Sequence, residues 1–111
     1  MDDNLKSLLK HLDDQQASNI SFFDIKLSAL ADVMIIVTAR SNVHARSLGY
    51  SVKKYLKKIS KNVSVEGVEQ GEWVLVDSPW VMVHILQEAA RDYYDLDNLW
   101  PTTIPFLDHE S

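Results

Sequence analysis

The stretch VMIIVT, residues 33–38, decides the fold of this 111-residue chain. It is rich in β-branched residues and carries no charge, which is typical of a β-strand. Its apolar residues do not alternate with polar ones, so both faces of the strand are expected to be covered. The stretch therefore predicts a central strand in a layered protein of the α/β (α+β) class.

A long helix is expected directly after this strand. Ser41 or Asn42 can cap its first turn, and apolar residues then recur every three or four positions as far as Ile59. We place this helix over residues 42–60. Because it returns the chain across the sheet, it should set two strands parallel through a right-handed crossover.

The rest of the chain supplies further helices and strands. Four leucines between residues 5 and 12 share one side of a helix predicted over residues 2–16. Runs of β-branched and aromatic residues predict strands at 19–25, 63–66, 72–77 and 80–86, with Ser78 and Pro79 in the last turn. A short helix over 87–95 follows, and two prolines in 101–111 predict a loose tail. We place residues 1–111 in one domain, built on a single mixed β-sheet flanked by helices.

Composition excludes several classes of protein. Apolar residues make up 46% and charged residues 24% of the chain, an ordinary balance for a globular protein. There is no cysteine, so disulfides and thiolate chemistry are excluded. We see no signal peptide and no apolar run of the ~18 residues that a membrane span needs, and expect a cytoplasmic protein. The net charge of -5 suits a basic protein partner better than nucleic acid.

Residues that carry chemistry are scattered rather than grouped. A two-metal site would need paired acids on a strand beside a glycine-serine loop, and a helical zinc site would need two histidines four residues apart; neither pattern occurs. No glycine-rich phosphate loop or GxSxG motif is present either. We therefore predict no catalysis, no metal and no cofactor. We expect His84, set among apolar neighbours, to be a core or surface-edge histidine with one partner. The candidates weighed are Asp24, Asp32, Asp77, Asp92, Asp95, Asp97, His11, His44, His84 and His109.

Lysines and tryptophans are the leads to a partner. Five lysines between residues 53 and 61 complement the dipole of the long helix, so a solvated face is favoured, and a contact with RNA is left open. Trp73, Trp80 and Trp100 are large amphipathic side chains that can anchor an interface. Core packing and partner binding are equally weighted for Trp73. The hairpin 72–86 becomes the candidate binding face.

Three segments resemble one known family, the ribosomal silencing factors (RsfS, Iojap-like). They are LADVMIIVTARS (30–41), VEGVEQGEWVLVD (65–77) and VHILQEAARDYYDLDNLW (83–100), and the similarity runs from about residue 5 to residue 100. Its most specific parts are VEG followed by a W-apolar-apolar-apolar-D strand, an apolar-V-H strand, and the ending Y-x-L-x-x-L-W. The resemblance implies a sheet of nucleotidyltransferase-like shape that lacks that fold's catalytic groups.

The resemblance also implies a function. Family members bind large-subunit ribosomal protein L-fourteen, block docking of the small subunit and so repress translation when nutrients are scarce. Matched residue by residue, Trp73 and Val74 correspond to the binding strand, and Glu88 and Tyr94 to the neighbouring helix. A minor contact with ribosomal RNA and a homodimer off the ribosome are left open.

The chain departs from the family pattern at two places. Ala39 replaces the glycine usual after the threonine, and Ser78, Pro79 and Trp80 replace a short turn, which can present a different rim to the partner. Two other functions stay as alternatives. One is a nucleotidyltransferase-like enzyme that depends on Asp24 or Asp32, and the other is an RNA-binding accessory factor that uses the lysines.

Overall fold

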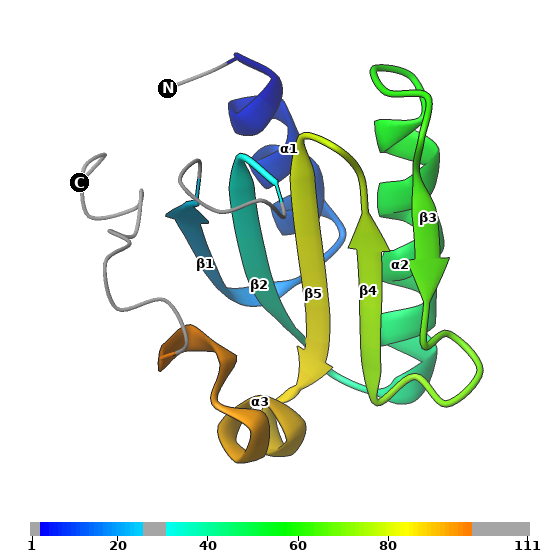
Figure 1. Ribbon diagram of the computed structural model, residues 1–111. Helices are drawn as coiled ribbons and strands as arrows, with labels where there is room; N and C mark the ends of the chain where they lie inside the picture. The colour runs from blue at the N-terminus through cyan, green and yellow to red at the C-terminus, as the bar shows by residue number, and fades with distance from the viewer. Residues whose placement is uncertain (1–2, 26–30, 99–111) are drawn as a thin grey trace.

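The computed structural model describes residues 3–25 and 31–98, whose strands form one five-stranded sheet (Figure 1). Across the sheet the strands follow the order β1-β2-β5-β4-β3. β2 and β5 are parallel, and the other neighbouring pairs are antiparallel, which confirms the predicted mixed sheet. The bounds are Ser18–Asp24 for β1, Val33–Ala39 for β2, Ser64–Glu66 for β3, Trp73–Asp77 for β4 and Val81–Gln87 for β5.

Helices lie on both faces of this sheet. The helices α1 (Asp3–Asp14) and α2 (Asn42–Leu56) lie behind it in Figure 1, and α3 (Glu88–Tyr94) lies in front with the 3-10 helix η1 (Leu96–Asn98). All seven residues of β2 are buried, so the prediction of a strand covered on both faces is confirmed. None of the helices in the described part of the chain combines the length and apolar content that a membrane span needs.

The long helix α2 begins where predicted but ends earlier. Ser41 is its N-cap, and the Ser41 Oγ accepts a hydrogen bond of 3.0 Å from the His44 backbone N–H. The prediction that the helix continues to residue 60 is wrong, because after Leu56 the backbone forms tighter i to i-3 bonds, such as Ile59 N–H to the Leu56 carbonyl. Ile59 is 45% exposed, so burial of its side chain adds little stability that would favour a longer helix. The other predicted boundaries differ from the observed ones by at most two residues.

The turn between β4 and β5 is closed by a side chain. The Ser78 Oγ donates to the Val81 carbonyl at 2.9 Å and accepts from the Val81 N–H at 3.0 Å. Ser78 and Pro79 therefore lie in the turn, as predicted, and β5 begins at Val81. The predicted loose tail, residues 101–111, lies outside the described residues.

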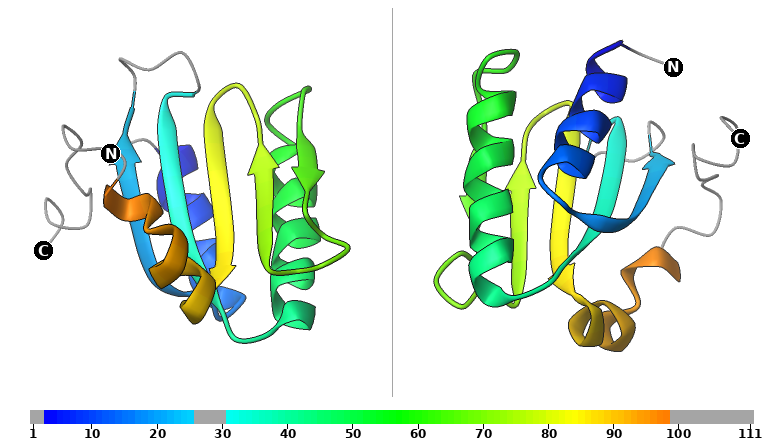
Figure 2. Two further views of the ribbon diagram at one scale, coloured as in Figure 1. Left: turned by 60° about the horizontal axis from the view of Figure 1, so that its bottom comes forward. Right: turned by 180° about the vertical axis from the view of Figure 1, so that it is seen from behind.

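Among the described residues, helices cover only part of the front face of the sheet. The left view of Figure 2 shows α3 on the side of β1, β2 and β5, while no described helix crosses β3 and β4 on this face. On the opposite face, shown in the right view, α2 packs against β3, β4 and β5. This half of the front face, over β3 and β4, is thus not covered by a described helix, and we call it the open face.

Candidate protein-binding face

Alternation along β4 decides which side chains reach the open face. Successive side chains of a strand point to opposite faces. Val74 is fully buried in the cluster beneath α2, whereas Trp73 packs with the cluster on the α3 face. Leu75 and Asp77 share the face of Trp73 and are half-buried. The open face of β4 is thus formed by Trp73, Leu75 and Asp77.

Val74 lies on the wrong side of the sheet for the contact that the family resemblance implies. A Cβ built at Gly49 of α2 would lie only 2.7 Å from Val74 Cγ1, so helix and strand approach closely here. A partner at the open face cannot touch the Val74 side chain. The residue packs β4 against α2, and its side chain is not exposed on the open face.

Trp73 lies at the centre of an aromatic group. Its ring centroid is 4.6 Å from that of Tyr94 in α3 and 5.8 Å from that of His84 in β5. The Trp73 Nε1–H donates a hydrogen bond of 3.0 Å to His84 Nδ1. Trp73 is half-buried and Tyr94 is 40% exposed, so each ring has one side against the protein and another side facing solvent. Trp73 therefore takes part in core packing while it stays partly exposed, and partner binding by this residue stays a prediction.

His84 is held neutral by its surroundings. It is only 6% exposed, and burial lowers its pKa to about 4. Because Nδ1 accepts from Trp73, the single proton of the neutral ring is on Nε2. The prediction of a core histidine with one partner is confirmed. With this pKa, His84 is a weak base at neutral pH.

A groove with a volume of about 360 Å³ runs beside Trp73 and Tyr94. The loop that follows β3 shapes it, since Gly67 and Gly71 adopt positive φ angles that favour glycine. Glu66 and Glu72 are exposed on its rim. Carboxylates beside aromatic faces attract a cationic side chain. The lining residues are Glu66, Gly67, Gln70, Glu72, Trp73, Leu75 and Tyr94.

Glu88 is separate from this groove. It begins α3 and is exposed, but it does not line the groove. At about 100° per residue, the six positions between Glu88 and Tyr94 place the two side chains on different sides of the helix. Of the four residues that the family resemblance implies, the structure brings together Trp73 and Tyr94 only.

The candidate catalytic acids do not form one cluster, although Asp24 and Asp32 lie at the same end of the neighbouring strands β1 and β2. Asp24 ends β1, Asp32 precedes β2 and Asp77 ends β4. β1 and β4 are three strand spacings apart, which separates Asp24 from Asp77 by about 14 Å. Within residues 3–25 and 31–98, no three histidine or acidic side chains are placed to hold one metal ion.

Two other histidines tie α1 and its following turn to α2. His11 shares a hydrogen bond of 2.7 Å with Ser51. The Nε2 of His44 is 2.9 Å from the Gln15 carbonyl, which lies just after α1. Both contacts hold the first helix and its turn against α2.

The remaining histidine and tryptophan candidates contribute no described residue to the open face. Trp80 packs against the cluster beneath α1 and α2. His109 and Trp100 lie outside the described residues.

Sequence reasoning missed part of the site. Leu75, Glu66 and Glu72 were not identified as members of it, although Trp73 and Leu75 are two residues apart and so must share a face. It also missed Arg91, a single basic residue among the acids of segment 88–97. The Arg91 guanidinium forms an ion pair of 2.8 Å with Asp97.

Comparisons with known proteins agree with the earlier resemblance. A relative from Chromobacterium violaceum named as a ribosomal silencing factor is 41% identical over 97 residues, covering 86% of this chain and 80% of its own length. The mitochondrial Iojap-related protein of Arabidopsis thaliana is 30% identical over 102 residues, covering 86% of this chain and 55% of its own length. A crystal structure of a Chromobacterium violaceum protein superposes with a TM-score of 0.81 at 38% identity, covering 91% of this chain and 88% of that one. The family model of the ribosomal silencing factor during starvation, RsfS, matches residues 1–111, and the chain therefore belongs to this family.

Proposed function

We propose that this ribosomal silencing factor binds large-subunit ribosomal protein L-fourteen through its open face and thereby prevents the small subunit from joining. Translation is reduced in consequence when nutrients are limiting. The protein acts in the cytoplasm by steric exclusion, as a binding module without catalytic activity of its own.

The observation that carries this proposal is the groove beside Trp73 and Tyr94. Two partly exposed aromatic rings offer a large apolar contact, and tryptophan and tyrosine are enriched among residues that dominate binding energy. Glu66 and Glu72 on the rim add negative charge in a chain whose net charge is -5. Ribosomal proteins are commonly basic, so charges of opposite sign would steer and orient docking.

Binding of purified L-fourteen tests the face directly. Tyr94→Ala removes an exposed ring from the groove, whereas the control Tyr50→Ala removes a ring that is 55% exposed on α2, on the opposite face. Truncating a central interface residue costs ~2 kcal/mol or more, so Tyr94→Ala should weaken binding about thirtyfold. Tyr50→Ala should leave affinity unchanged. Equal affinities for the two variants would count against the face.

The charge on the rim is tested separately. Replacing Glu66 and Glu72 with lysine should weaken the binding of L-fourteen. The loss of affinity should become larger as the ionic strength falls, because like charges then repel more strongly. The matched control is Asp3→Lys together with Asp13→Lys, which reverses the same number of exposed acids on α1, behind the sheet. Loss of affinity in the control to the same extent would show that only net charge matters.

A second contact, with ribosomal RNA, is favoured by the distribution of charge. Seven of the eleven basic residues lie between Arg40 and Lys61, and no acidic residue lies between Asp32 and Glu66. Lys54, Lys57, Lys58 and Lys61 are exposed. Binding of a naked RNA hairpin that weakens steeply with salt, and that is lost when these lysines are replaced by glutamine, would support this contact. A salt-independent interaction would contradict it.

Two remaining questions have simple tests. The alternative of a nucleotidyltransferase-like enzyme predicts turnover with nucleotides and divalent metal, lost on mutation of Asp24 or Asp32. We expect no turnover.

A homodimer off the ribosome is tested by sedimentation. The purified protein would then have twice the monomer mass, and the dimer would dissociate when L-fourteen is added.

A further inference from the structure

We propose that Arg91 is a positioning residue for the open face: its guanidinium fixes α3 on the sheet and so holds Tyr94 against Trp73. This inference rests on the proposed binding of L-fourteen, because Tyr94 lines the groove through which that binding would occur. Arg91 itself contributes no contact with the partner.

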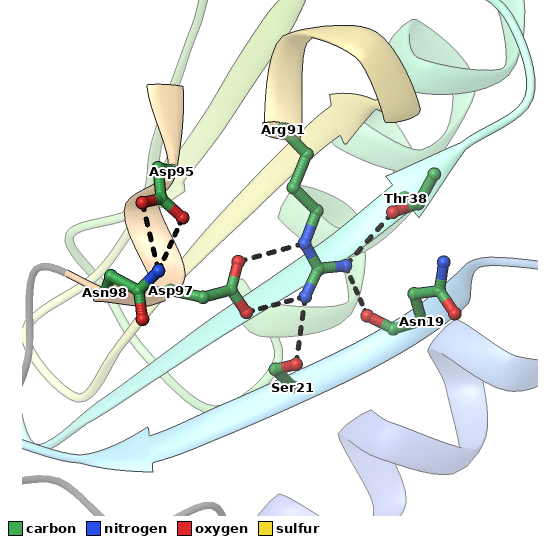
Figure 3. Close-up of polar contacts among 7 residues, drawn as sticks. All are labelled: Asn19, Ser21, Thr38, Arg91, Asp95, Asp97 and Asn98. Atoms are coloured by element: carbon green, nitrogen blue, oxygen red, sulfur yellow. Dashed lines mark hydrogen bonds and ion pairs between the residues drawn. The ribbon is translucent and has the colours of Figure 1, made fainter. Parts of the chain in front are cut away.

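Every N–H donor of the Arg91 side chain is occupied (Figure 3). Nε and Nη2 donate to the two carboxylate oxygens of Asp97 at 3.1 and 2.8 Å. Nη2 also donates to Ser21 Oγ at 2.9 Å, and Nη1 donates to Thr38 Oγ1 at 3.0 Å and to the Asn19 carbonyl. An arginine has five such donors, so none is left for an external anion.

These acceptors come from separate parts of the fold. Asn19 and Ser21 belong to β1, Thr38 to β2 and Asp97 to η1. The pairing of β1 with β2 is irregular between Ser18 and Ser21, and Asn19 has a φ of 47°. This bulge frees the Asn19 carbonyl from the regular ladder. A single planar fork thus connects α3 and η1 to two strands.

Besides Leu96, which follows in η1 and is buried, helix α3 has little apolar surface to hold it on the sheet. It has seven residues, which is too short for a helix to be stable by itself. Its one buried apolar side chain is Ala90. The Arg91 side chain is only 11% exposed, and its hydrogen bond is the largest cause of the lowered pKa of Asp97. The ion pair is therefore present at neutral pH.

Tyr94 is three residues after Arg91, on the next turn of α3. Its centroid distance of 4.6 Å to Trp73 therefore depends on how α3 is rotated and placed on the sheet. Loss of the planar fork should let α3 move, and Tyr94 should then leave the wall of the groove. The sheet beneath does not depend on this contact, because β2 and β5 pair along seven residues.

The variant Arg91→Lys tests the inference, since lysine keeps the charge but cannot form the two-pronged contact with Asp97. Arg46→Lys is the matched control, since Arg46 is a half-buried arginine whose Nη1 reaches the Glu69 carbonyl at 3.4 Å. Asp97→Asn removes the other half of the ion pair. All are compared with the parent by melting, by the NMR signal of the Trp73 indole N–H, and by affinity for purified L-fourteen. Trp73→Phe assigns that signal among the three tryptophans.

We expect Arg91→Lys to shift the Trp73 indole signal, because the Tyr94 ring moves away, and to weaken L-fourteen binding at least tenfold while melting stays cooperative. Asp97→Asn should do the same to a smaller degree, and Arg46→Lys should do neither. An unchanged indole signal in a destabilised Arg91→Lys protein would overturn the positioning role and leave a purely structural one. A shifted signal with parental affinity would overturn the link to binding. If the parent does not bind L-fourteen, the proposed function fails, while the indole signal still reports whether Arg91 positions Tyr94.

Discussion

Protonation of His84 should make the fold sensitive to mild acid. Burial lowers the pKa of His84 to about 4, whereas an unfolded histidine titrates near 6.5. Between these two values the unfolded chain binds more protons than the folded one. The contribution of neutral His84 to stability is therefore complete above pH 6.5 and is lost progressively as the pH falls toward 4. From the two pKa values, the free energy of unfolding should decrease by about 1 kcal/mol between pH 7.5 and pH 5.5 because of this residue alone.

The assay is urea unfolding at several pH values between 7.5 and 5.5, with the variant His84→Asn as the comparison. Asparagine offers an oxygen that can accept the Trp73 indole N–H but takes up no proton in this range. The variant should lose about 1 kcal/mol less stability than the parent over the same interval. His11, whose pKa is also lowered chiefly by burial, is present in both proteins and cancels in the comparison. Parallel pH dependences for parent and variant would refute the reasoning that the folded state keeps His84 neutral.

Two further predictions concern α2. Gly49→Ala places a methyl group 2.7 Å from Val74 Cγ1, so it should lower the free energy of unfolding by about 1–3 kcal/mol. The control Ser47→Ala, at an exposed position of the same helix, should not lower it. Equal urea midpoints for the two variants would contradict the close packing of α2 on β4. Ser41→Ala removes the N-cap hydrogen bond to the His44 N–H and should cost ~1 kcal/mol in the same experiment; an unchanged midpoint would show that this bond contributes nothing.

Local patterns in the sequence were enough to predict the central strand and the hairpin. The uncharged, β-branched run at 33–38 predicted a strand covered on both faces, and every residue of β2 is buried. Ser78 and Pro79 identified the turn that precedes β5. These features depend on residues close in sequence, where spacing carries the information.

Features that depend on distant residues were not predictable in the same way. The sequence does not say that β5 inserts between β2 and β4, and this placement brings His84 beside Trp73. The contacts of Arg91 join it to residues about 70 positions earlier in the chain, at Asn19 and Ser21. Val74 was grouped with Trp73 because family similarity follows sequence position, but alternation along β4 turns the two side chains to opposite faces.

The most direct test of the central claim is a subunit-joining measurement. Purified small and large subunits are mixed with the parent or with Trp73→Ala, and joined ribosomes are separated from free subunits on a sucrose gradient. Trp73 is half-buried, so its truncation should cost less than the ~3–5 kcal/mol of a fully buried tryptophan, and melting of the same sample shows that the variant is folded. We predict that the parent leaves the subunits separate and that folded Trp73→Ala lets them join. A folded Trp73→Ala protein that still keeps the subunits apart would contradict the assignment of the open face as the silencing surface.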